Sequence, residues 1–344
     1  KNLSAKKQLK TKSKEIEFID LFAGIGGIRL GFERAFGENS KTVFVSEWDK
    51  FAQQTYKANF EDDFEIAGDI TKIDEKSIPN HQILCAGFPC QPFSISGKQK
   101  GFADTRGTMF FEICRIIKEK NPPVVMLENV KHLVHHDHGN TLKTIIQNLE
   151  NLGYTVNSKV LNALDFGVPQ NRERILIIGS KDGIKFDFSK VKKQERKRLV
   201  DFLDTEGDFE YLKEGTYTII DNPKQQVSGL IFAGYRNKSI RKVGVREGTE
   251  HLSRVHKQPN RIYSVLGTHP TLPSQEPSGR FFILLENGKV RKLTLNECWR
   301  IMGFPESYKK ISSTAEQYKQ LGNSVCVPMI AAVAEQIKEQ FFGK

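Results

Sequence analysis

The sequence predicts an α/β protein built on a doubly wound, mostly parallel sheet, with a second, smaller, loop-rich β domain. Two observations carry this prediction. Short apolar strands alternate with helices over the first 190 residues, a pattern typical of a parallel sheet covered on both faces. Between residues 200 and 290, Gly, Pro, Ser and Asn are scattered and helical periodicity is weak, which predicts an irregular β region.

The expected elements follow from short apolar runs and from helical spacing of apolar residues. Strands are expected over 17–22, 42–45, 83–86, 123–129, 154–162 and 174–179. Helices are expected over 28–36, 50–59, 108–120 and 142–152. Downstream, Thr294 and Glu297 form the pattern of a capped helix start, and 331–342 is expected to be a closing helix.

Composition excludes several classes of protein. No apolar run approaches the roughly 18 residues of a membrane helix, and the basic start of the chain lacks the apolar core of a signal peptide. The five cysteines are an odd number and form no CxxC pair, which argues against a disulfide framework or a zinc site. We therefore expect a cytoplasmic protein in a reducing compartment, with no metal and no membrane partner.

The net charge of +11 is concentrated in two segments. Residues 1–14 carry six Lys and no acid, and residues 223–262 carry nine Lys or Arg against two Glu. The rest of the chain is close to neutral. One basic internal segment on a near-neutral body predicts a polyanion-binding surface, such as a nucleic-acid interface. A solvated basic face is the alternative.

A glycine turn directly after the first strand predicts a ligand site. Gly24 and Gly26 let the backbone approach a ligand and leave helix N–H groups free. Their order is Phe-x-Gly-x-Gly-Gly rather than the dinucleotide Gly-x-Gly-x-x-Gly, so a pyrophosphate is not the expected ligand. A tight structural turn is the alternative for the glycines taken alone.

Two acids and an indole lie near that turn in the expected fold. Glu47 ends the second strand, where doubly wound folds place an acid for ribose hydroxyls. Trp48 can stack on a purine, and Asp69, expected to follow a third strand, can accept from an exocyclic amine. These features suit an adenosine ligand without phosphate, and S-adenosylmethionine fits that description.

Four further residues are candidate catalytic residues, namely Cys90, Glu128, Arg172 and Arg174. The strand over 83–86 runs through Gly87-Phe88-Pro89 and delivers Cys90 to a polar loop, where an exposed thiolate can act as a nucleophile. A half-buried packing cysteine is the alternative. Glu128 ends a very apolar strand, so its carboxyl is expected to be nearly buried and to retain its proton more readily. Such a group can protonate a ring nitrogen.

Arg172 and Arg174 are two residues apart and share one face of an extended segment. That face can offer bidentate contacts to a base edge or a phosphate. A buried structural ion pair for Glu128 and a surface pair for the arginines are the alternatives.

Five sequence segments, taken in their order along the chain, resemble the motifs of a known protein family. They are Phe18 to Gly27, Gly87 to Gln91, Glu128 to Val130, Gln170 to Arg174, and Gly322 to Val325. In this order they resemble the DNA (cytosine-5)-methyltransferases of the bacterial restriction–modification type. The resemblance covers nearly all of 17–342 apart from roughly 190–260.

The resemblance implies a mechanism on a base that has left the helix. Cys90 is expected to attack C6 of a flipped-out cytosine, and Glu128 to contact N3 and the exocyclic amine. Arg172 and Arg174 are expected to hold the base and the adduct, and Arg174 is expected to have the more structural role of the two. The methyl group of S-adenosylmethionine goes to C5, leaving S-adenosylhomocysteine. The sequence does not identify the base that removes the C5 proton.

The resemblance also implies two sets of binding residues. The cofactor is expected to be lined by Phe22, Gly24, Gly26, Glu47, Trp48, Asp69, Ile70, Pro89, Met109, Asn323 and Val325. Residues 93–107 are expected to form a lid that closes over DNA. Contacts to DNA are expected from Gln91, Ser94, Ser96, Lys98, Arg106, Arg236, Arg241, Arg254, Thr271, Leu272, Gln275 and Arg280. Arginine reads guanine edges and glutamine reads adenine, whereas phosphate positioning is the alternative for any one of them.

The expected organisation has four parts. Residues 1–16 form a basic disordered arm, 17–190 a catalytic and cofactor-binding domain, 191–290 a target-recognition domain with a hinge, and 291–344 a segment that returns to the catalytic domain. The expected partner is double-stranded DNA, bound by a monomer. A cognate restriction endonuclease is expected to be paired in function but not bound.

Two other functions compete with this interpretation. One is a tRNA cytosine-5 methyltransferase of the same family, whose members typically have a smaller variable region. The other is a catalytically dead DNA-binding module, against which the intact Cys90, Glu128 and Arg172 argue.

Overall fold

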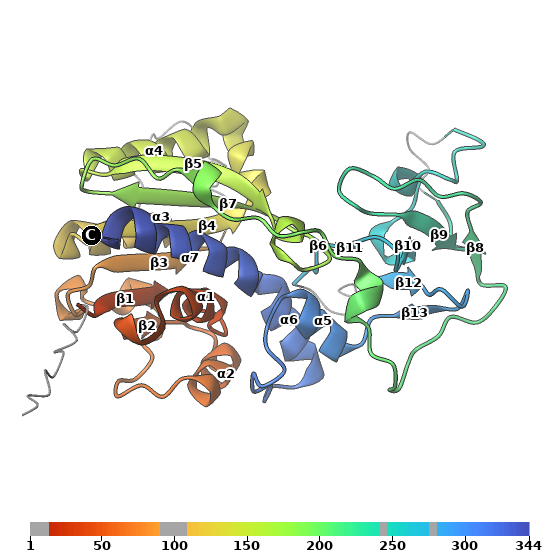
Figure 1. Cartoon of the computed structure of the whole chain (residues 1–344), viewed down its shortest axis with the longest axis horizontal. Helices are drawn as coiled ribbons and strands as arrows, with labels where there is room; N and C mark the ends of the chain where they lie inside the picture. Colours follow the sequence, from red (N-terminus) through yellow and green to blue (C-terminus); the bar gives the residue numbers. More distant parts are fainter. Residues whose placement is uncertain (1–13, 90–108, 241–245, 275–280, 344) are drawn as a thin grey trace, which may run out of the picture.

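The computed structural model describes residues 14–89, 109–240, 246–274 and 281–343. The chain forms a large lobe and a small lobe, with a helical region between them (Figure 1). The large lobe contains a six-stranded sheet and the small lobe a five-stranded sheet.

The large sheet has the strand order β2-β1-β3-β4-β7-β5. Its members are β1 (Ile16–Leu21), β2 (Ser40–Ser46), β3 (Ile83–Gly87), β4 (Val124–Val130), β5 (Thr155–Asn162) and β7 (Glu173–Ser180). The first four strands of this order are parallel, whereas β7 runs antiparallel to both of its neighbours. The predicted doubly wound, mostly parallel sheet is confirmed, with β7 as the exception.

Helices cover both faces of this sheet. Phe18 packs with α1 (Gly27–Phe36) and α7 (Val327–Phe342), whereas Ile19 and Leu21 pack with α3 (Met109–Lys120) and α4 (Asn140–Asn151). This division follows from the alternation of side chains along a strand. A further helix, α2 (Lys50–Asn59), packs Tyr56 against β2.

The closing helix begins earlier than the sequence predicts. α7 starts at Val327 rather than at residue 331, with Pro328 in its first turn. The missing N–H of proline costs nothing there, because the first N–H groups of a helix have no intrahelical partner. The helix α6 (Thr314–Asn323), capped by the Ser313 side chain, was not predicted.

The region expected to be irregular contains a defined sheet. The strands β8 (Tyr217–Ile219), β9 (Phe232–Arg236), β10 (Arg261–Ser264), β12 (Phe282–Leu284) and β13 (Val290–Lys292) pair in the order β13-β12-β10-β9-β8. The expected boundary at residue 290 falls on β13. A short parallel pair, β6 (Gln170–Asn171) with β11 (His269–Pro270), joins the two lobes.

Short 3-10 helices connect many of these elements. They are η1 (Gly37–Asn39), η2 (Ile70–Lys72), η3 (Glu75–Ser77), η5 (Lys131–Val134), η6 (His136–Gly139), η7 (Ala163–Phe166), η8 (Phe188–Lys190), η9 (Leu199–Phe202), η10 (Ser253–Val255) and η11 (Gln258–Asn260). Among the described residues, no helix is long and apolar enough to cross a membrane.

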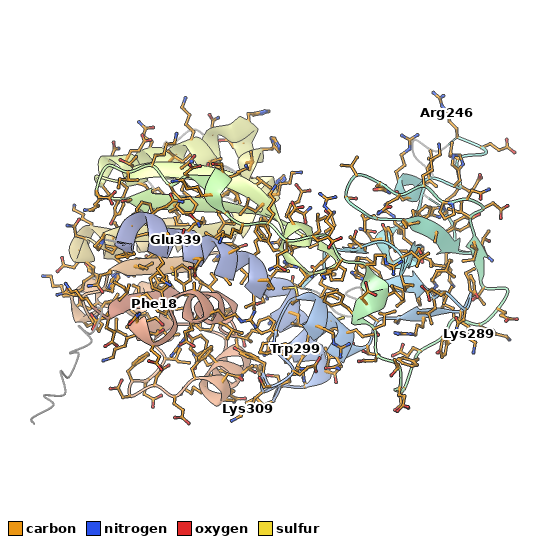
Figure 2. All side chains as sticks on the ribbon, in the orientation of Figure 1. Phe18, Arg246, Lys289, Trp299, Lys309 and Glu339 are labelled. Carbon is orange, nitrogen blue, oxygen red and sulfur yellow. The ribbon has the colours of Figure 1, made fainter. Side chains whose placement is uncertain are left out.

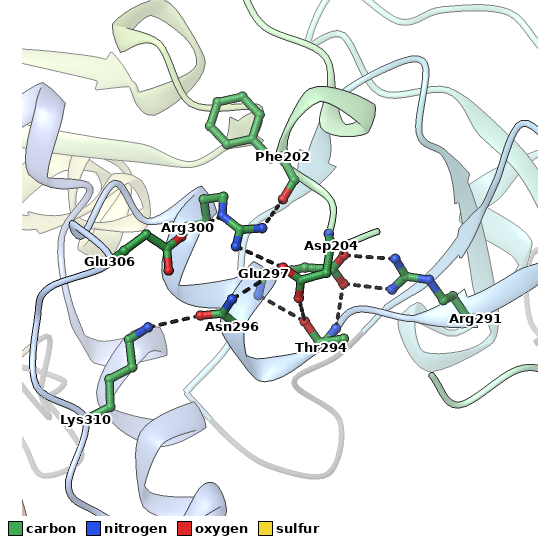
Figure 3. Close-up of polar contacts among 9 residues, drawn as sticks. All are labelled: Phe202, Asp204, Arg291, Thr294, Asn296, Glu297, Arg300, Glu306 and Lys310. Carbon is green, nitrogen blue, oxygen red and sulfur yellow. Dashed lines mark hydrogen bonds and ion pairs between the residues drawn. The ribbon is translucent and has the colours of Figure 1, made fainter. Parts of the chain in front are cut away.

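A buried carboxylate fixes the small lobe to the helical region (Figure 3). Glu297, fully buried in α5 (Leu295–Ile301), accepts two hydrogen bonds from the Arg291 guanidinium, at 2.7 and 2.9 Å. It also accepts from the N–H groups of Thr294, at 2.7 Å, and Asp204, at 2.9 Å. The predicted capping box of Thr294 and Glu297 is confirmed. One side chain therefore ties the chain entering the small lobe to the chain leaving it.

The helical region around this carboxylate has an aromatic core. Figure 2 places Trp299 between the two lobes, where it is 1% exposed. Its ring lies 5.1 Å from that of Phe304 and its Nε1 donates to Gln317. Polar and aromatic contacts together hold α5 and α6 at the junction.

A buried acid in β1 links folding to pH. Asp20 is fully buried, accepts from the Tyr56 hydroxyl at 2.9 Å, and its Oδ1 accepts no bond from the described residues. Burial raises its pKa from 3.8 to about 7, with a smaller opposing effect of the Tyr56 hydrogen bond. Between these values the folded protein holds a proton that the unfolded chain releases, so stability falls as pH rises through this window.

We predict that Asp20→Asn removes the loss of folding stability that the wild type shows as pH rises. Because a pKa unit corresponds to about 1.4 kcal/mol, the variant is expected to be more stable than the wild type by a few kcal/mol at pH 8. Near pH 4 the two proteins are expected to unfold at similar urea concentrations. A stability difference that does not change between pH 4 and pH 8 would contradict this account of Asp20.

Candidate active site

A cavity of about 740 Å³ lies at the carboxyl ends of the parallel strands. Its walls come from the ends of β1 to β4, from residues 271–274 of the crossing between the lobes, and from residues 316–324 in and after α6. The carboxyl end of a doubly wound sheet is the position where such folds bind ligands. The cavity therefore joins parts of the chain that are up to three hundred residues apart.

The half of the cavity near β1 is built on an unusual backbone. Phe22, directly after β1, has φ of 54°, a left-handed conformation that is costly for a bulky residue. Gly24 also has a positive φ, and its N–H donates to Glu47 Oε2 at 2.8 Å. Burial raises the pKa of Glu47, and the N–H groups of Gly24 and Asp49 oppose this shift. Trp48, 79% exposed, lies at the rim.

The predicted cofactor residues divide into two groups. Phe22, Gly24, Glu47, Trp48, Pro89 and Asn323 line the cavity. Gly26, Asp69, Ile70, Met109 and Val325 are not among its lining residues.

Each residue of the second group has another environment. A Cβ on Gly26 would meet the Phe60 ring at 2.5 Å, so this glycine permits packing. Asp69 does not follow a strand as expected. It is exposed and caps η2, accepting from the Thr71 N–H and hydroxyl at 2.9 and 2.7 Å. Ile70 and Val325 are buried in the core, and Met109, the first residue of α3, is partly buried against it.

The other half of the cavity contains a carboxyl and a guanidinium. Glu128 is 8% exposed, and burial raises its pKa, whereas Arg174 and Arg172 oppose that shift. The Arg174 Nε lies 3.4 Å from Glu128 Oε1. The prediction of a nearly buried Glu128 is confirmed.

The predicted nucleophile lies just beyond the described chain. Pro89 lines the cavity and is the last described residue before Cys90. Asn129, next to Glu128, donates to the Phe88 carbonyl at 3.1 Å and so fixes the end of β3 beside the carboxyl. Also outside the described residues are Gln91, Ser94, Ser96, Lys98, Arg106, Arg241, Gln275 and Arg280.

Arg172 is fully buried and bound to backbone carbonyls. Its Nη1 donates to Leu272 at 3.0 Å, and its Nη2 donates to Gly322 at 2.8 Å and Ser324 at 2.7 Å. Burial lowers the pKa of this guanidinium, and the adjacent Arg174 adds to the shift. Both arginines line the cavity, where Arg174 faces Glu128 and Arg172 ties backbone segments together. Their expected roles on a bound base stay a prediction.

The predicted recognition residues also lie in two places. Thr271 and Leu272 line the cavity, and the Thr271 hydroxyl donates to the Asn171 carbonyl at 2.6 Å. Arg236 lies in β9 with its guanidinium 5.2 Å from the centre of the Phe282 ring, and Arg254 is exposed on η10. These two belong to the small lobe and do not line the cavity.

Gln170 is a buried residue to which the sequence assigned no role. Its Oε1 accepts from the Leu272 N–H at 3.1 Å, and its Nε2 donates to the Ile301 carbonyl at 3.0 Å. Its position two residues before Arg172, in the same sequence block, was the available signal. Among the described residues, no group of three or more His, Cys, Asp or Glu is arranged to hold a metal ion.

The fold and this cavity define a class of protein. A mixed α/β fold with a mostly parallel central sheet is consistent with the fold of S-adenosylmethionine-dependent methyltransferases. The family model for C-5 cytosine-specific DNA methylase matches residues 16–339. The chain belongs to this family and is an enzyme, a DNA (cytosine-5)-methyltransferase.

Individual relatives agree with this assignment. The chain is 44% identical over 328 residues to type II methyltransferase M.HhaI of Haemophilus parahaemolyticus, covering 94% of each chain. It is 46% identical over 322 residues to type II methyltransferase M.HaeII of Haemophilus aegyptius, covering 93% of this chain and 92% of that protein. The crystal structure of S. pombe Dnmt2 methyltransferase superposes with a TM-score of 0.68, covering 95% of this chain and 99% of that one. At 19% identity, that likeness shows the fold alone.

Proposed function

We propose that this enzyme methylates C5 of a cytosine within one short duplex sequence, through a covalent bond between Cys90 and C6, using S-adenosylmethionine. The observation that carries the proposal is the single cavity that contains Glu47 at one end and Glu128 at the other, with Pro89, the neighbour of Cys90, in its wall. A methyl donor and a flipped base can meet only in a space that both can enter.

The residues of the β1 half fit an adenosine group. Gly24 leaves open space beside the turn after β1, since a Cβ on this residue would meet nothing within 4 Å. Glu47 lies beside this turn with carboxylate lone pairs for hydroxyl groups, and Trp48 offers an exposed indole face for a purine. When bound there, S-adenosylmethionine supplies the methyl group.

The residues of the β4 half fit a cytosine. The Cys90 thiolate attacks C6, and the protonated Glu128 carboxyl, favoured by its raised pKa, donates toward N3. C5 then carries the electron pair that takes the methyl group. Loss of the C5 proton to a base restores the C5–C6 double bond and expels the thiolate. Arg174, 3.4 Å from Glu128, orients this carboxyl.

The biological setting we propose is protection of host DNA in a restriction–modification system. Similarity to type II methyltransferases such as M.HhaI supports this setting. The cognate endonuclease is paired in function only, and the enzyme acts as a monomer in the bacterial cytoplasm. The small lobe, whose tip and outer edge carry the basic Arg246 and Lys289 in Figure 2, is proposed to choose the target.

We predict methylation at one short motif when the protein is expressed in a bacterial host free of cytosine methylation. Bisulfite sequencing of the host DNA measures the motif and the modified base together. Transfer RNA from the same cells is analysed in parallel. Methylated tRNA with unmethylated DNA, from a soluble protein, would overturn the DNA assignment in favour of the tRNA alternative.

We predict that Cys90→Ser lowers the rate of methyl transfer by at least about a thousandfold, because a hydroxyl is a far weaker nucleophile than a thiolate. Cys114→Ser is the matched control, since Cys114 is a partly buried cysteine of α3 that does not line the cavity. Transfer of labelled methyl groups to duplex DNA measures both. A Cys90→Ser enzyme as active as wild type would exclude the covalent mechanism.

We predict that Trp48→Ala weakens binding of S-adenosylhomocysteine by about 5- to 150-fold, the effect of losing one base–aromatic stack of about 1–3 kcal/mol. Phe51→Ala is the control, because Phe51 is 49% exposed on α2 but does not line the cavity. Isothermal titration calorimetry without DNA provides the measurement. Equal affinities for the two variants would place the purine elsewhere.

A further inference from the structure

The turn that follows β1 carries three residues in left-handed backbone conformations. Phe22, Gly24 and Gly26 have φ of 54°, 56° and 95°. Such conformations persist where the surrounding structure holds them, and they cost most for a bulky residue such as Phe22. Because Phe22, Gly24 and Ile25 line the cavity, the conformation of this turn decides the shape of the β1 half.

The N–H groups of the turn are held by its immediate neighbours. The Ala23 N–H donates to the Ser46 carbonyl at 3.0 Å, and the Gly26 N–H donates to the Ala23 carbonyl at 3.0 Å. The Gly24 N–H donates to the Glu47 carboxylate at 2.8 Å. The carbonyl side of the turn is held from a different part of the chain.

A tyrosine from the helical region binds that carbonyl side. The Tyr308 hydroxyl, 283 residues away in the sequence, donates to the Ile25 carbonyl. Tyr308 lies between α5 and α6, is buried, and is not among the lining residues of the cavity. It is therefore placed to act on the β1 half through the backbone of the turn, without contacting a ligand there.

Gly26 makes room for this support. A Cβ on Gly26 would lie 2.5 Å from the Phe60 ring and 3.0 Å from the Tyr308 hydroxyl. The Phe60 and Tyr308 rings meet edge to face, with their centres 6.3 Å apart. On its other side Tyr308 packs against Phe304 and Trp299, at 4.9 and 6.1 Å between ring centres. The turn thus lies against rings that belong to the aromatic core of the helical region.

We propose that Tyr308 is a positioning residue for the cofactor, acting through the Ile25 carbonyl on the turn that receives the methyl donor. The inference rests on the proposed function, in which S-adenosylmethionine binds in the β1 half. Without the hydroxyl the turn is free to leave its bound conformation, and ligand binding then has to restore it, which lowers the apparent affinity. Glu128 and Arg174 pair with each other in the β4 half, so the step after binding is expected to keep its rate.

Tyr308→Phe tests the proposal, because it removes the hydroxyl and keeps the ring. We expect S-adenosylhomocysteine to bind about 2- to 12-fold more weakly, the affinity equivalent of the net contribution of one hydrogen bond. The KM for S-adenosylmethionine is expected to rise by a similar factor with kcat unchanged, the pattern of a change in binding alone. Isothermal titration calorimetry without DNA and methyl transfer to duplex DNA provide the two measurements.

Tyr154→Phe is the matched control. The Tyr154 hydroxyl donates to the Pro122 carbonyl at 2.6 Å, its side chain is buried, and neither residue lines the cavity. Both variants lose a bond from a buried tyrosine to a backbone carbonyl, but only Tyr308→Phe is expected to alter the affinity for the cofactor. Equal losses of affinity in the two variants would overturn the proposal, because a general loss of stability would then explain them.

Phe60→Leu tests the same support by a second route, since it removes the ring that meets both Gly26 and Tyr308. We expect a higher KM for S-adenosylmethionine and an unchanged kcat here as well. Wild-type affinity in a Tyr308→Phe protein that folds, as judged by circular dichroism, would overturn the inference alone. Where that variant does not fold, wild-type affinity in Phe60→Leu has the same consequence. A folded wild type that binds no S-adenosylhomocysteine would overturn the proposed cofactor site, and the inference with it.

Discussion

The structure of the cavity depends on one buried cation. Arg172 is buried in the cavity wall and donates to three backbone carbonyls that are 100, 150 and 152 residues away in the sequence. A buried charge is tolerated only where hydrogen bonds compensate its lost hydration, so the position of the guanidinium dictates where those carbonyls lie. The wall shared by the two lobes is built around this requirement.

Glu297 is a second buried charged side chain that links the small lobe to the helical region. Its carboxylate accepts four hydrogen bonds, from Arg291, Thr294 and Asp204, and thereby joins the entry and the exit of the small lobe. Arg172 therefore holds the segment at Leu272, and Glu297 holds the segments at Asp204 and Arg291. Two buried charged side chains thus help to fix the small lobe to the rest of the protein.

The same physical effect, burial in the apolar sheet, acts on two acids with different consequences. Asp20 in β1 and Glu128 in β4 both have raised pKa values because of desolvation. Asp20 faces Tyr56 inside the core, whereas Glu128 lines the cavity. Access to the cavity, rather than the direction of the pKa shift, therefore distinguishes Glu128 from Asp20.

The sequence by itself determined the local features and the order of the motifs. The six strands of the large sheet, the capping box of Thr294 and Glu297, and the burial of Glu128 follow from neighbouring residues, whose spacing and apolarity are visible in the chain. Tertiary structure alone decided which groups Arg172, Arg174 and Gln170 contact, the exposure of Asp69 and the pairing of the small sheet. Each of these depends on a partner brought close by folding, such as Leu272 for Arg172, and residue spacing carries no information about such a partner.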